Sequence, residues 1–193
     1  MGRPDPDEDE ARVAAVRRLI GPDADPMVDA NMAWTAGEAL ERGRRLEVHA
    51  LRWLEEPTLP EDVAGHARLV AALDTPIAVG RACTPHEFER YVAARAVGVV
   101  QIDPVTNGGI TASLRALRLA DAAGLPTSSH YADELSAHLL CASRRPLYLE
   151  KHAFALGPYL EVPQEVAGGR VRPTEGPGTD LRFDRAALAP FRA

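Results

Sequence analysis

The sequence predicts an α/β fold in which a parallel sheet curls into part of a (β/α) barrel. Short apolar, β-rich runs alternate with longer amphipathic runs, which is typical of βα units and of a parallel sheet covered by helices. Polar residues follow several of these short runs, at the expected carboxyl ends of strands. About six βα units can be recognised, fewer than a closed eight-stranded barrel requires.

The predicted strands are short runs rich in apolar residues, most of them bounded by proline or glycine. They cover Pro26–Ala30, Val48–Leu54, Pro76–Gly80, Val97–Ile102, Pro126–Ser129 and Leu147–Glu150. Amphipathic patterns between them predict helices over Glu8–Ile20, Thr35–Leu46, Pro60–Leu73, Pro85–Arg95, Ile110–Ala123 and Asp133–Ser143. Pro85 stands in a first helical turn, where its missing N–H is harmless, and Gly124 stops a helix before the next strand.

Two architectures fit this alternation, a doubly wound sheet and a barrel, and the polar strand ends favour the barrel. Asp29, Glu55, Asp103, His130 and Glu150 each follow a different predicted strand. A doubly wound sheet uses only the strands at its switch point for a site, whereas all strand ends of a barrel converge on one mouth. An open six-stranded sheet would expose two edges, so the chain resembles most of a barrel without its first strands.

The chain divides by composition into two parts. Residues 1–156 carry the βα pattern and are expected to form the incomplete barrel. From residue 157 the composition shifts to proline, glycine and charged residues, which predicts an irregular strand-and-turn tail over 157–193. With 193 residues in all, one domain can bury a sizeable core.

Composition excludes several classes of function. Hydrophobic residues make up 46% of the chain and the formal net charge is −6, so no basic surface for nucleic acid or membrane is expected. Cys83 and Cys141 form no CxxC motif, which favours reduced thiols in a cytoplasmic protein. The acidic N-terminus is unlike a signal peptide, and no apolar run approaches the ~20 residues of a membrane span.

Two carboxylates indicate a metal site. Asp29, Glu55 and Arg81 follow one another at equal intervals, which predicts that they lie side by side at the mouth. Neighbouring carboxylates repel unless a cation lies between them, and oxygen ligands suit Mg²⁺. Each carboxylate could instead cap the next helix or pair with an arginine, but the repeated spacing favours the metal.

Three further residues indicate acid–base chemistry. Asp103 and His130 end consecutive strands, and an aspartate that orients a histidine is a common general base. Alternatively, His130 bonds a backbone carbonyl and Asp103 serves the turn before Pro104. Glu150 is a candidate proton donor, with an ion pair to a neighbouring basic residue (Lys151 or Arg145) equally compatible with the sequence.

Six motifs together resemble the mandelate racemase/muconate lactonizing enzyme family of the enolase superfamily, in its acid-sugar dehydratase-like branch. In chain order they are DANMAW, WLEEPT, VGR, QIDPVTNGGIT, SSHYADELSAHLL and LYLEK, and the resemblance extends over about residues 7–183. It implies a capping α+β domain followed by a TIM-type (β/α)7β barrel, of which this chain is the C-terminal portion. It also implies Mg²⁺ and removal of the proton α to a carboxylate, giving dehydration or racemisation of a sugar acid or 2-hydroxy acid.

The resemblance assigns roles to the residues already singled out. Asp29 and Glu55 become Mg²⁺ ligands, Asp103 and His130 become the dyad with His130 as the base, and Glu150 becomes the acid that contacts the substrate carboxylate. In addition, Asn31 and Arg81 become candidate substrate contacts.

Arg81 departs from the family pattern, because the third metal ligand at its position is a glutamate. We expect its guanidinium to form an ion pair with Asp29 and Glu55 in the place of the metal, which weakens or abolishes Mg²⁺ binding. Alternatively, Arg81 turns to solvent and a weak two-carboxylate site remains.

A second departure is that the chain lacks the capping domain, the first two strands and a Lys-x-Lys pair of the family. Met1-Gly2 stands where the family has Val-Gly after those lysines, so we expect the reading frame to continue upstream.

The leading hypothesis is a truncated, impaired lyase or isomerase that takes a small-molecule carboxylate. One alternative is a non-catalytic pseudoenzyme that binds a carboxylate or a partner, and another is a composite enzyme whose missing strands come from a separate chain. Open sheet edges predict a homo-oligomer, or aggregation of the chain on its own.

Overall fold

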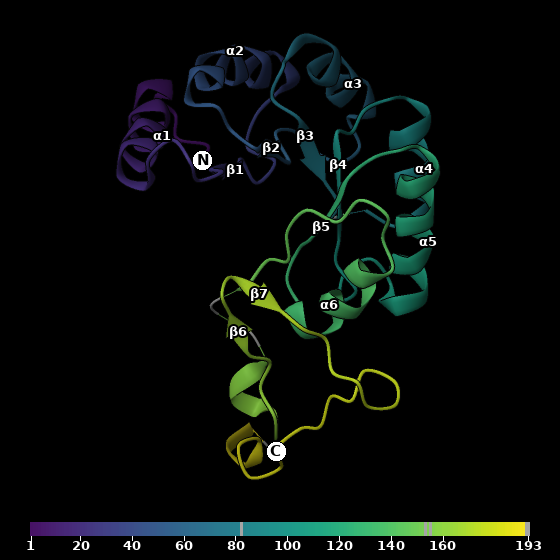
Figure 1. Cartoon of the computed structure of the whole chain (residues 1–193). Helices are drawn as coiled ribbons and strands as arrows, with labels where there is room; N and C mark the ends of the chain where they lie inside the picture. The colour runs from purple at the N-terminus through teal and green to yellow at the C-terminus, as the bar shows by residue number, and fades with distance from the viewer. Residues whose placement is uncertain (82, 153, 155, 192–193) are drawn as a thin grey trace.

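The fold is a curled, open sheet of five parallel strands with helices on its outer side (Figure 1). The computed structural model describes residues 1–81, 83–152, 154 and 156–191. Strands and helices alternate as α1 (Pro6–Ile20), β1 (Met27–Asp29), α2 (Ala36–Leu46), β2 (Trp53–Glu55), α3 (Val63–Ala72), β3 (Ile77–Val79), α4 (Pro85–Ala93), β4 (Val99–Ile102), α5 (Gly109–Ala122), β5 (Thr127–Ser129) and α6 (Asp133–Cys141). The predicted partial barrel is confirmed.

Side-chain caps fix where two of the helices begin. Thr35 and Glu38 form a reciprocal capping box at α2, and Thr84 and Glu87 form the same arrangement at α4. Each box satisfies backbone N–H groups that the first helical turn leaves without partners. At α4 the cap is followed by Pro85, which needs no N–H partner there.

Strand pairing brings the carboxyl ends of the strands to one edge. The strands are ordered β1 to β5, and every neighbouring pair is parallel. Asp29 lies opposite Glu55, and Glu55 lies opposite Ala78. At the other end of the sheet, Ile102 lies opposite Ser129. The polar residues that follow these strands therefore share one rim.

The predicted strand Leu147–Glu150 is not a strand among the assigned elements, and that expectation was wrong in detail. The segment runs extended beside β5, where Leu147 donates to the Thr127 carbonyl at 2.8 Å and Ser129 donates to the Tyr148 carbonyl at 3.1 Å. Pro146 has no N–H to extend this ladder. The Glu150 N–H bonds the Ser129 hydroxyl at 2.8 Å instead of a main-chain carbonyl, which ends the pairing.

A second deviation affects the predicted strand Val48–Leu54. Its first part belongs to a 3₁₀ helix, η1 (Glu47–His49), and Ala50 then takes a left-handed conformation with φ of 50°. A left-handed residue cannot continue an extended strand, so β2 begins only at Trp53. The apolar pattern alone did not reveal this turn.

The two faces of the sheet bury different amounts of apolar surface. The main core lies between the sheet and the helices and includes Val28, Leu54, Ile77, Val79, Val100, Ile102, Leu69, Phe88, Tyr91 and Leu117. The inner face carries a smaller cluster of Trp53, Ala78 and Val99, against which Leu147 packs. Because side chains alternate along a strand, the polar Asp29, Glu55 and Gln101 also belong to this inner face.

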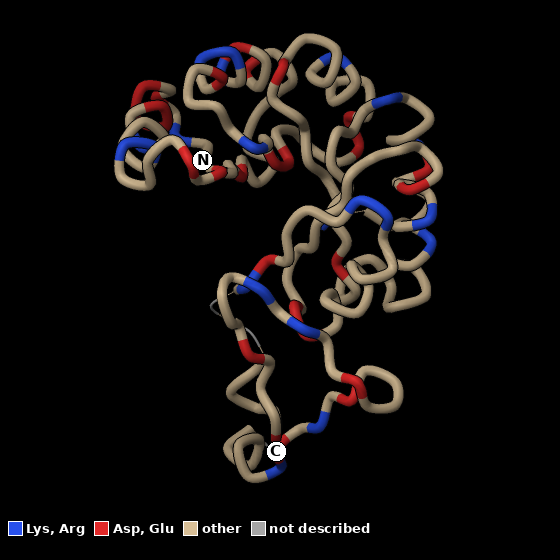
Figure 2. Tube along the Cα trace, viewed as in Figure 1, with Lys and Arg blue, Asp and Glu red and all other residues tan. Residues whose placement is uncertain are grey.

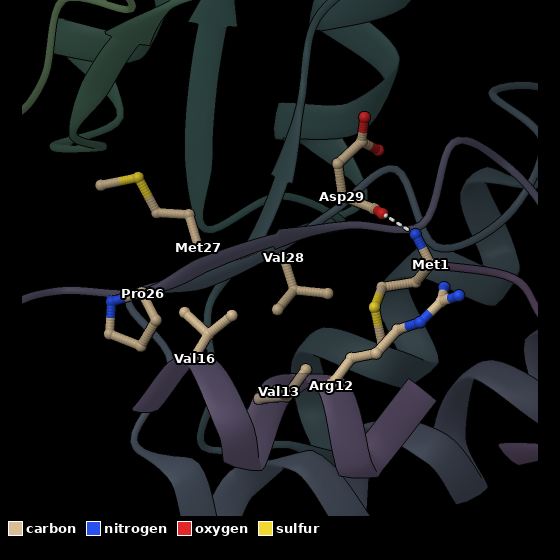
Figure 3. A pocket seen from close by; sticks show the side chains of 8 residues that line it. All are labelled: Met1, Arg12, Val13, Val16, Pro26, Met27, Val28 and Asp29. Carbon is tan, nitrogen blue, oxygen red and sulfur yellow. Dashed lines mark hydrogen bonds between the residues drawn. The ribbon is translucent and has the colours of Figure 1, made fainter. Parts of the chain in front are cut away.

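The first helix covers the outer side of β1 but leaves a hollow beside it (Figure 3). This hollow has a volume of about 200 Å³, and Val13, Val16 and Met27 are among the residues that line it. In the described part of the chain, β1 pairs with another strand only on its β2 side. On its other side, the Met1 ammonium donates to the Asp29 carbonyl at 2.8 Å.

Acidic and basic residues are interspersed along α1 and α2 (Figure 2). Arg45 on α2 forms ion pairs with Asp7 at 2.5 Å and with Glu10 at 2.6 Å on α1. These partly exposed contacts tie the two helices together, although exposed pairs of this kind stabilise a fold only weakly. Among the described residues, none of the helices combines the length and the apolar character needed to cross a bilayer.

The last part of the chain is a loosely folded tail. It contains η2 (Gly157–Tyr159), an antiparallel hairpin of β6 (Val166–Ala167) and β7 (Arg170–Val171), and η3 (Ala189–Phe191). Gly168 and Gly169 turn the hairpin with positive φ values of 57° and 71°, a combination that favours glycine. The tail is joined to α6 by the Thr174 hydroxyl, which lies 3.2 Å from His138 Nε2.

We expect the 193-residue chain to self-associate through the open edge of β1. Parallel sheet edges and exposed apolar side chains favour association, and Val16 and Met27 are 49% and 37% exposed beside this edge. The substitution Val16→Glu places a charge in the hollow and should lower the apparent mass in light scattering after size-exclusion chromatography.

The matched control is Val105→Glu, because Val105 is 59% exposed but does not line this hollow. It should associate like the wild-type chain. A wild-type chain that remains monomeric over the whole accessible concentration range would contradict the expectation.

Candidate functional site

The structure brings the two predicted metal ligands together. Asp29 and Glu55 are direct neighbours across the β1–β2 ladder. Asp29 accepts hydrogen bonds from the backbone N–H and the side-chain amide of Asn31, both at 2.6 Å. Glu55 accepts from the Trp53 indole at 3.1 Å and from the Gln101 amide at 2.8 Å.

The surroundings of Glu55 disfavour its charged form. Burial raises the pKa of its carboxyl above the ordinary value, and the negative charge of Asp29 raises it further. The hydrogen bonds from Gln101 and Trp53 oppose this shift. The raised pKa of Glu55 therefore reflects its burial first and the adjacent carboxylate second.

Arg81 does not lie between the two carboxylates, so the expected ion pair with Asp29 and Glu55 was wrong. Its guanidinium forms an ion pair with Glu56 at 2.7 Å and donates to the Asn31 side-chain oxygen at 2.9 Å. Equal spacing along the chain misled here, because the ladder partner of Glu55 is Ala78 and Arg81 lies on the turn beyond β3. Arg81 has not turned to solvent either, since it is held by two partners.

Asn31 links the displaced arginine to the carboxylate pair. Its side-chain oxygen accepts from Arg81 while its NH₂ group donates to Asp29. Asn31 adopts a left-handed conformation with φ of 49°, which asparagine tolerates better than most residues. The predicted substrate contacts Asn31 and Arg81 therefore form one connected network with Asp29 and Glu56.

These residues do not fit a three-carboxylate Mg²⁺ site. Two neighbouring carboxylates are present, but the described residues contain no group of three histidine, cysteine, aspartate or glutamate side chains that could hold a metal ion. Arg81 stands at the third position and offers nitrogen donors instead of an oxygen ligand. The oxygen ligands beside Asp29 and Glu55 also include the Gln101 side-chain oxygen, which has no hydrogen-bond partner among the described residues.

The predicted dyad is assembled at the rim. His130 Nδ1 lies 2.9 Å from Asp103 Oδ2, and the Asp103 side chain is 1% exposed while that of His130 is 19% exposed. Asp103 also accepts the Val105 N–H at 2.8 Å, so it serves the turn before the next helix as well. The sequence left two roles open for Asp103, as the partner of His130 and as a turn residue, and the structure shows both contacts.

Electrostatics favour a protonated His130 more than its burial suggests. Burial by itself lowers the pKa of the imidazole, but the hydrogen bond that it donates to Asp103 and the negative charges of Glu150, Asp103 and Glu55 raise it above the ordinary value. For Asp103, burial raises the pKa, whereas the hydrogen bonds that it accepts from His130 and from the Val105 N–H lower it overall. The pair is therefore an ionised aspartate beside a basic histidine.

Glu150 stands at the same rim, on the segment that runs beside β5. Its carboxylate accepts the Tyr131 N–H at 2.6 Å. The alternative ion pair with Lys151 or Arg145 does not occur among the described residues, because Lys151 pairs with Asp133 and Arg145 donates to the Gly124 carbonyl.

The inner face opens into a cavity of about 310 Å³. Asp29, Glu55, Glu150, Gln101, Ser128, Ser129, Trp53 and Tyr148 are among the residues that line it. Sequence reasoning missed Gln101, although a glutamine inside the apolar run Val99–Ile102 was a visible signal of a polar inner face. It also missed Glu56, for which the motif gives no signal beyond its neighbour Glu55.

The chain matches the family model described as "Enolase C-terminal domain-like" over residues 1–187. It is 36% identical over 185 residues to 3,6-anhydro-alpha-L-galactonate cycloisomerase of Streptomyces coelicolor, covering 95% of this chain and 51% of that protein. It is 38% identical over 172 residues to L-talarate/galactarate dehydratase of Salmonella typhimurium, covering 89% and 43% respectively. The chain thus spans about half the length of the curated relatives it matches.

Solved structures agree with these relatives. The L-talarate dehydratase of Polaromonas sp. JS666, complexed with Mg and L-glucarate, has a TM-score of 0.91 and 36% identity, covering 98% of this chain and 53% of that one. A racemase of Streptomyces coelicolor with bound magnesium has a TM-score of 0.93 and 35% identity, with coverage of 98% and 53%. Together with the rim of acidic residues and the His–Asp dyad, these matches show that the chain belongs to the mandelate racemase/muconate lactonizing enzyme family of the enolase superfamily.

Proposed function

We propose that this site binds a small sugar acid or 2-hydroxy acid and that His130 accepts the proton from the carbon α to its carboxylate. The observation that carries the proposal is the 2.9 Å contact between His130 Nδ1 and Asp103 Oδ2. Relatives support the substrate class, because they include a talarate/galactarate dehydratase and a structure complexed with L-glucarate. The whole protein's activity and substrates are part of the proposal, since the chain spans about half of these relatives.

The dyad supplies the base in this proposal. An ionised carboxylate can only accept a hydrogen bond, so the hydrogen of the neutral imidazole resides on Nδ1 and the lone pair on Nε2. Nε2 is then the atom that takes the substrate proton, and Asp103 stabilises the resulting imidazolium. Glu150, as a carboxylic acid, is proposed to donate a hydrogen bond to the substrate carboxylate, while its other oxygen accepts the Tyr131 N–H.

We propose that Mg²⁺ binding is weakened in this chain. Two observations support a missing ligand as the cause: Arg81 stands at the third position, and it pairs with Glu56 instead of entering between Asp29 and Glu55. The ion pair neutralises much of the repulsion that a free guanidinium would exert on a cation. In this proposal, Asp29 and Glu55 form a weak two-carboxylate site for Mg²⁺. This resembles the alternative prediction, in which Arg81 does not occupy the place of the metal and a weak site remains.

A second candidate function is binding of a carboxylate or a partner without catalysis. The lack of a three-carboxylate group in the described residues favours it, because the family relies on metal to stabilise the charge formed on proton removal. Arg81 remains a candidate anion contact in that case, provided that it can release Asn31. A further proposal is that a separate polypeptide supplies additional strands, which co-purification would reveal.

Replacing the arginine with an acidic residue should restore metal affinity. Arg81→Glu supplies the third oxygen ligand, whereas Arg81→Gln removes the charge without supplying a carboxylate. In calorimetric titrations with Mg²⁺, we expect Arg81→Glu to bind at least about tenfold more tightly than Arg81→Gln, or about 1.4 kcal/mol. Micromolar Mg²⁺ binding by the wild-type chain would refute the proposed weakening.

Because Glu56 is 5% exposed, both substitutions remove a cation from a buried carboxylate. Thermal melts of the two variants should therefore accompany the titrations. If both variants lose a comparable amount of stability, the difference in their Mg²⁺ affinities can be attributed to the added carboxylate.

Proton transfer can be tested separately from the overall reaction. The wild-type chain should exchange the α-hydrogen of galactarate for deuterium in D₂O, which NMR detects as loss of the α-proton signal. The exchange rate should rise with pH through the pKa of His130, because only the neutral imidazole accepts a proton. His130→Asn should abolish it.

Equal exchange in the wild type and His130→Asn would contradict the role of His130. Saturable binding of galactarate without any exchange would favour the non-catalytic candidate.

The dyad also makes a direct prediction about titration. NMR of the imidazole should give a His130 pKa above the ordinary value of about 6.5. Asp103→Asn removes the charge that stabilises the imidazolium, so the His130 pKa should fall in that variant. An unchanged titration would show that the two side chains are not coupled in solution.

A further inference from the structure

Asn107, in the turn between β4 and α5, is a buried side chain that joins two turns of the rim. The residue is 2% exposed. Its Oδ1 accepts the Asp103 N–H at 2.7 Å, and its Nδ2 donates to the carbonyls of Gly80 at 2.8 Å and of Cys83 at 2.7 Å. A buried amide is costly unless its polar atoms are paired, and here both of them are. One side chain therefore connects the turn that carries Asp103 to the turn beyond β3.

The amide of Asn107 can take only one orientation in this place. The Asp103 N–H can only donate and the two carbonyls can only accept, so a flipped amide would place NH₂ against N–H and oxygen against oxygen. Asn107 also donates its own backbone N–H to the Asp103 carbonyl at 2.8 Å. Asn107 thus holds the backbone of Asp103 at both its N–H and its carbonyl, which limits where the Asp103 side chain can point.

The turn beyond β3 is a firm anchor for this connection. Gly80 lies so close to β4 that a Cβ added to it would overlap the Gln101 carbonyl oxygen. The Thr106 hydroxyl donates to the Arg81 carbonyl at 2.6 Å, next to the two bonds that Asn107 makes to the same turn. A displacement of the Asp103 backbone would therefore have to break these bonds or move the whole turn.

We propose that Asn107 is a positioning residue for the dyad, because it fixes the Asp103 backbone so that the Asp103 carboxylate meets His130 Nδ1. The inference rests on the proposed function, since it concerns the base of that reaction. Asn107 is buried and both of its polar atoms are occupied, so it does not contact the substrate. It acts through Asp103, whose bond to His130 keeps the hydrogen on Nδ1 and leaves Nε2 free to accept a proton.

The contacts of Asp103 divide this task. The Val105 N–H donates to Asp103 Oδ1 at 2.8 Å and limits rotation of the carboxylate. Asn107 instead determines where the Asp103 backbone lies, and its directional hydrogen bonds define that place more sharply than apolar packing would. Placement matters for a base, because a displacement of about 1 Å can lower a rate by about a hundredfold.

The test compares Asn107→Ala with Ser113→Ala by NMR titration of the His130 imidazole. Ser113 is a matched control, because it is also buried and its hydroxyl donates to the Gly109 carbonyl at 3.0 Å within α5. In Asn107→Ala the His130 pKa should fall, because a loosened Asp103 stabilises the imidazolium less. In Ser113→Ala the His130 pKa should equal that of the wild-type chain.

α-Hydrogen exchange of galactarate is the second measurement, made at a pH at which His130 is neutral in all three proteins. At saturating galactarate, the exchange rate of Asn107→Ala should be roughly tenfold or more below that of the wild type. The galactarate concentration for half-maximal rate should change less than about twofold, because Asn107 does not contact the substrate. A wild-type chain without exchange contradicts the proposed function, whereas the His130 titration still decides the role of Asn107.

An unchanged His130 pKa in Asn107→Ala would overturn the inference. An equal fall in Ser113→Ala would overturn it too, because the fall would then reflect a general loosening around α5. Should Asn107→Ala not fold, the wild-type chain decides. The side-chain amide signals of Asn107 should then shift with the same midpoint as the His130 titration, and signals that stay unmoved through it would overturn the inference.

Discussion

Main-chain pairing between the parallel strands determines where the polar residues at the carboxyl ends of the strands lie. The candidate site depends on that pairing. The ladder sets Asp29 opposite Glu55 and Ile102 opposite Ser129, so Asp103 and His130 follow the strands at adjacent places on the rim. Each strand is only three or four residues long, yet the helices outside hold the sheet in its curl. A shift of one residue in this register would turn the carboxylates toward the apolar core.

The rim consists of an acid–base half and a carboxylate half. His130 and Asp103 hold the geometry of a base and its orienting carboxylate. On the other side, Asp29 and Glu55 form a carboxylate pair, and Arg81 does not lie between them, because Glu56 and Asn31 hold it away.

Sequence patterns predicted the helices, the parallel sheet and the rim residues, because these follow from local periodicity and from the shared direction of the strands. Sequence patterns gave wrong predictions where the backbone conformation or the position of a side chain depends on a local turn or on a contact with another segment. The left-handed Ala50 delays β2, and the bond from the Glu150 N–H to the Ser129 hydroxyl ends the pairing beside β5. Equal spacing could not place Arg81, whose position depends on the turn after Gly80, where a Cβ would meet the Gln101 carbonyl oxygen at 1.6 Å.

The shared amide of Asn31 has a consequence for how this rim could change during evolution. One side-chain amide serves Arg81 with its oxygen and Asp29 with its nitrogen, while Glu56 neutralises the same guanidinium. An acidic side chain at position 81 would remove the donor to Asn31 and the cation beside Glu56. The effect of such a change on stability is therefore expected to depend on Asn31 and Glu56, because the three side chains share one network.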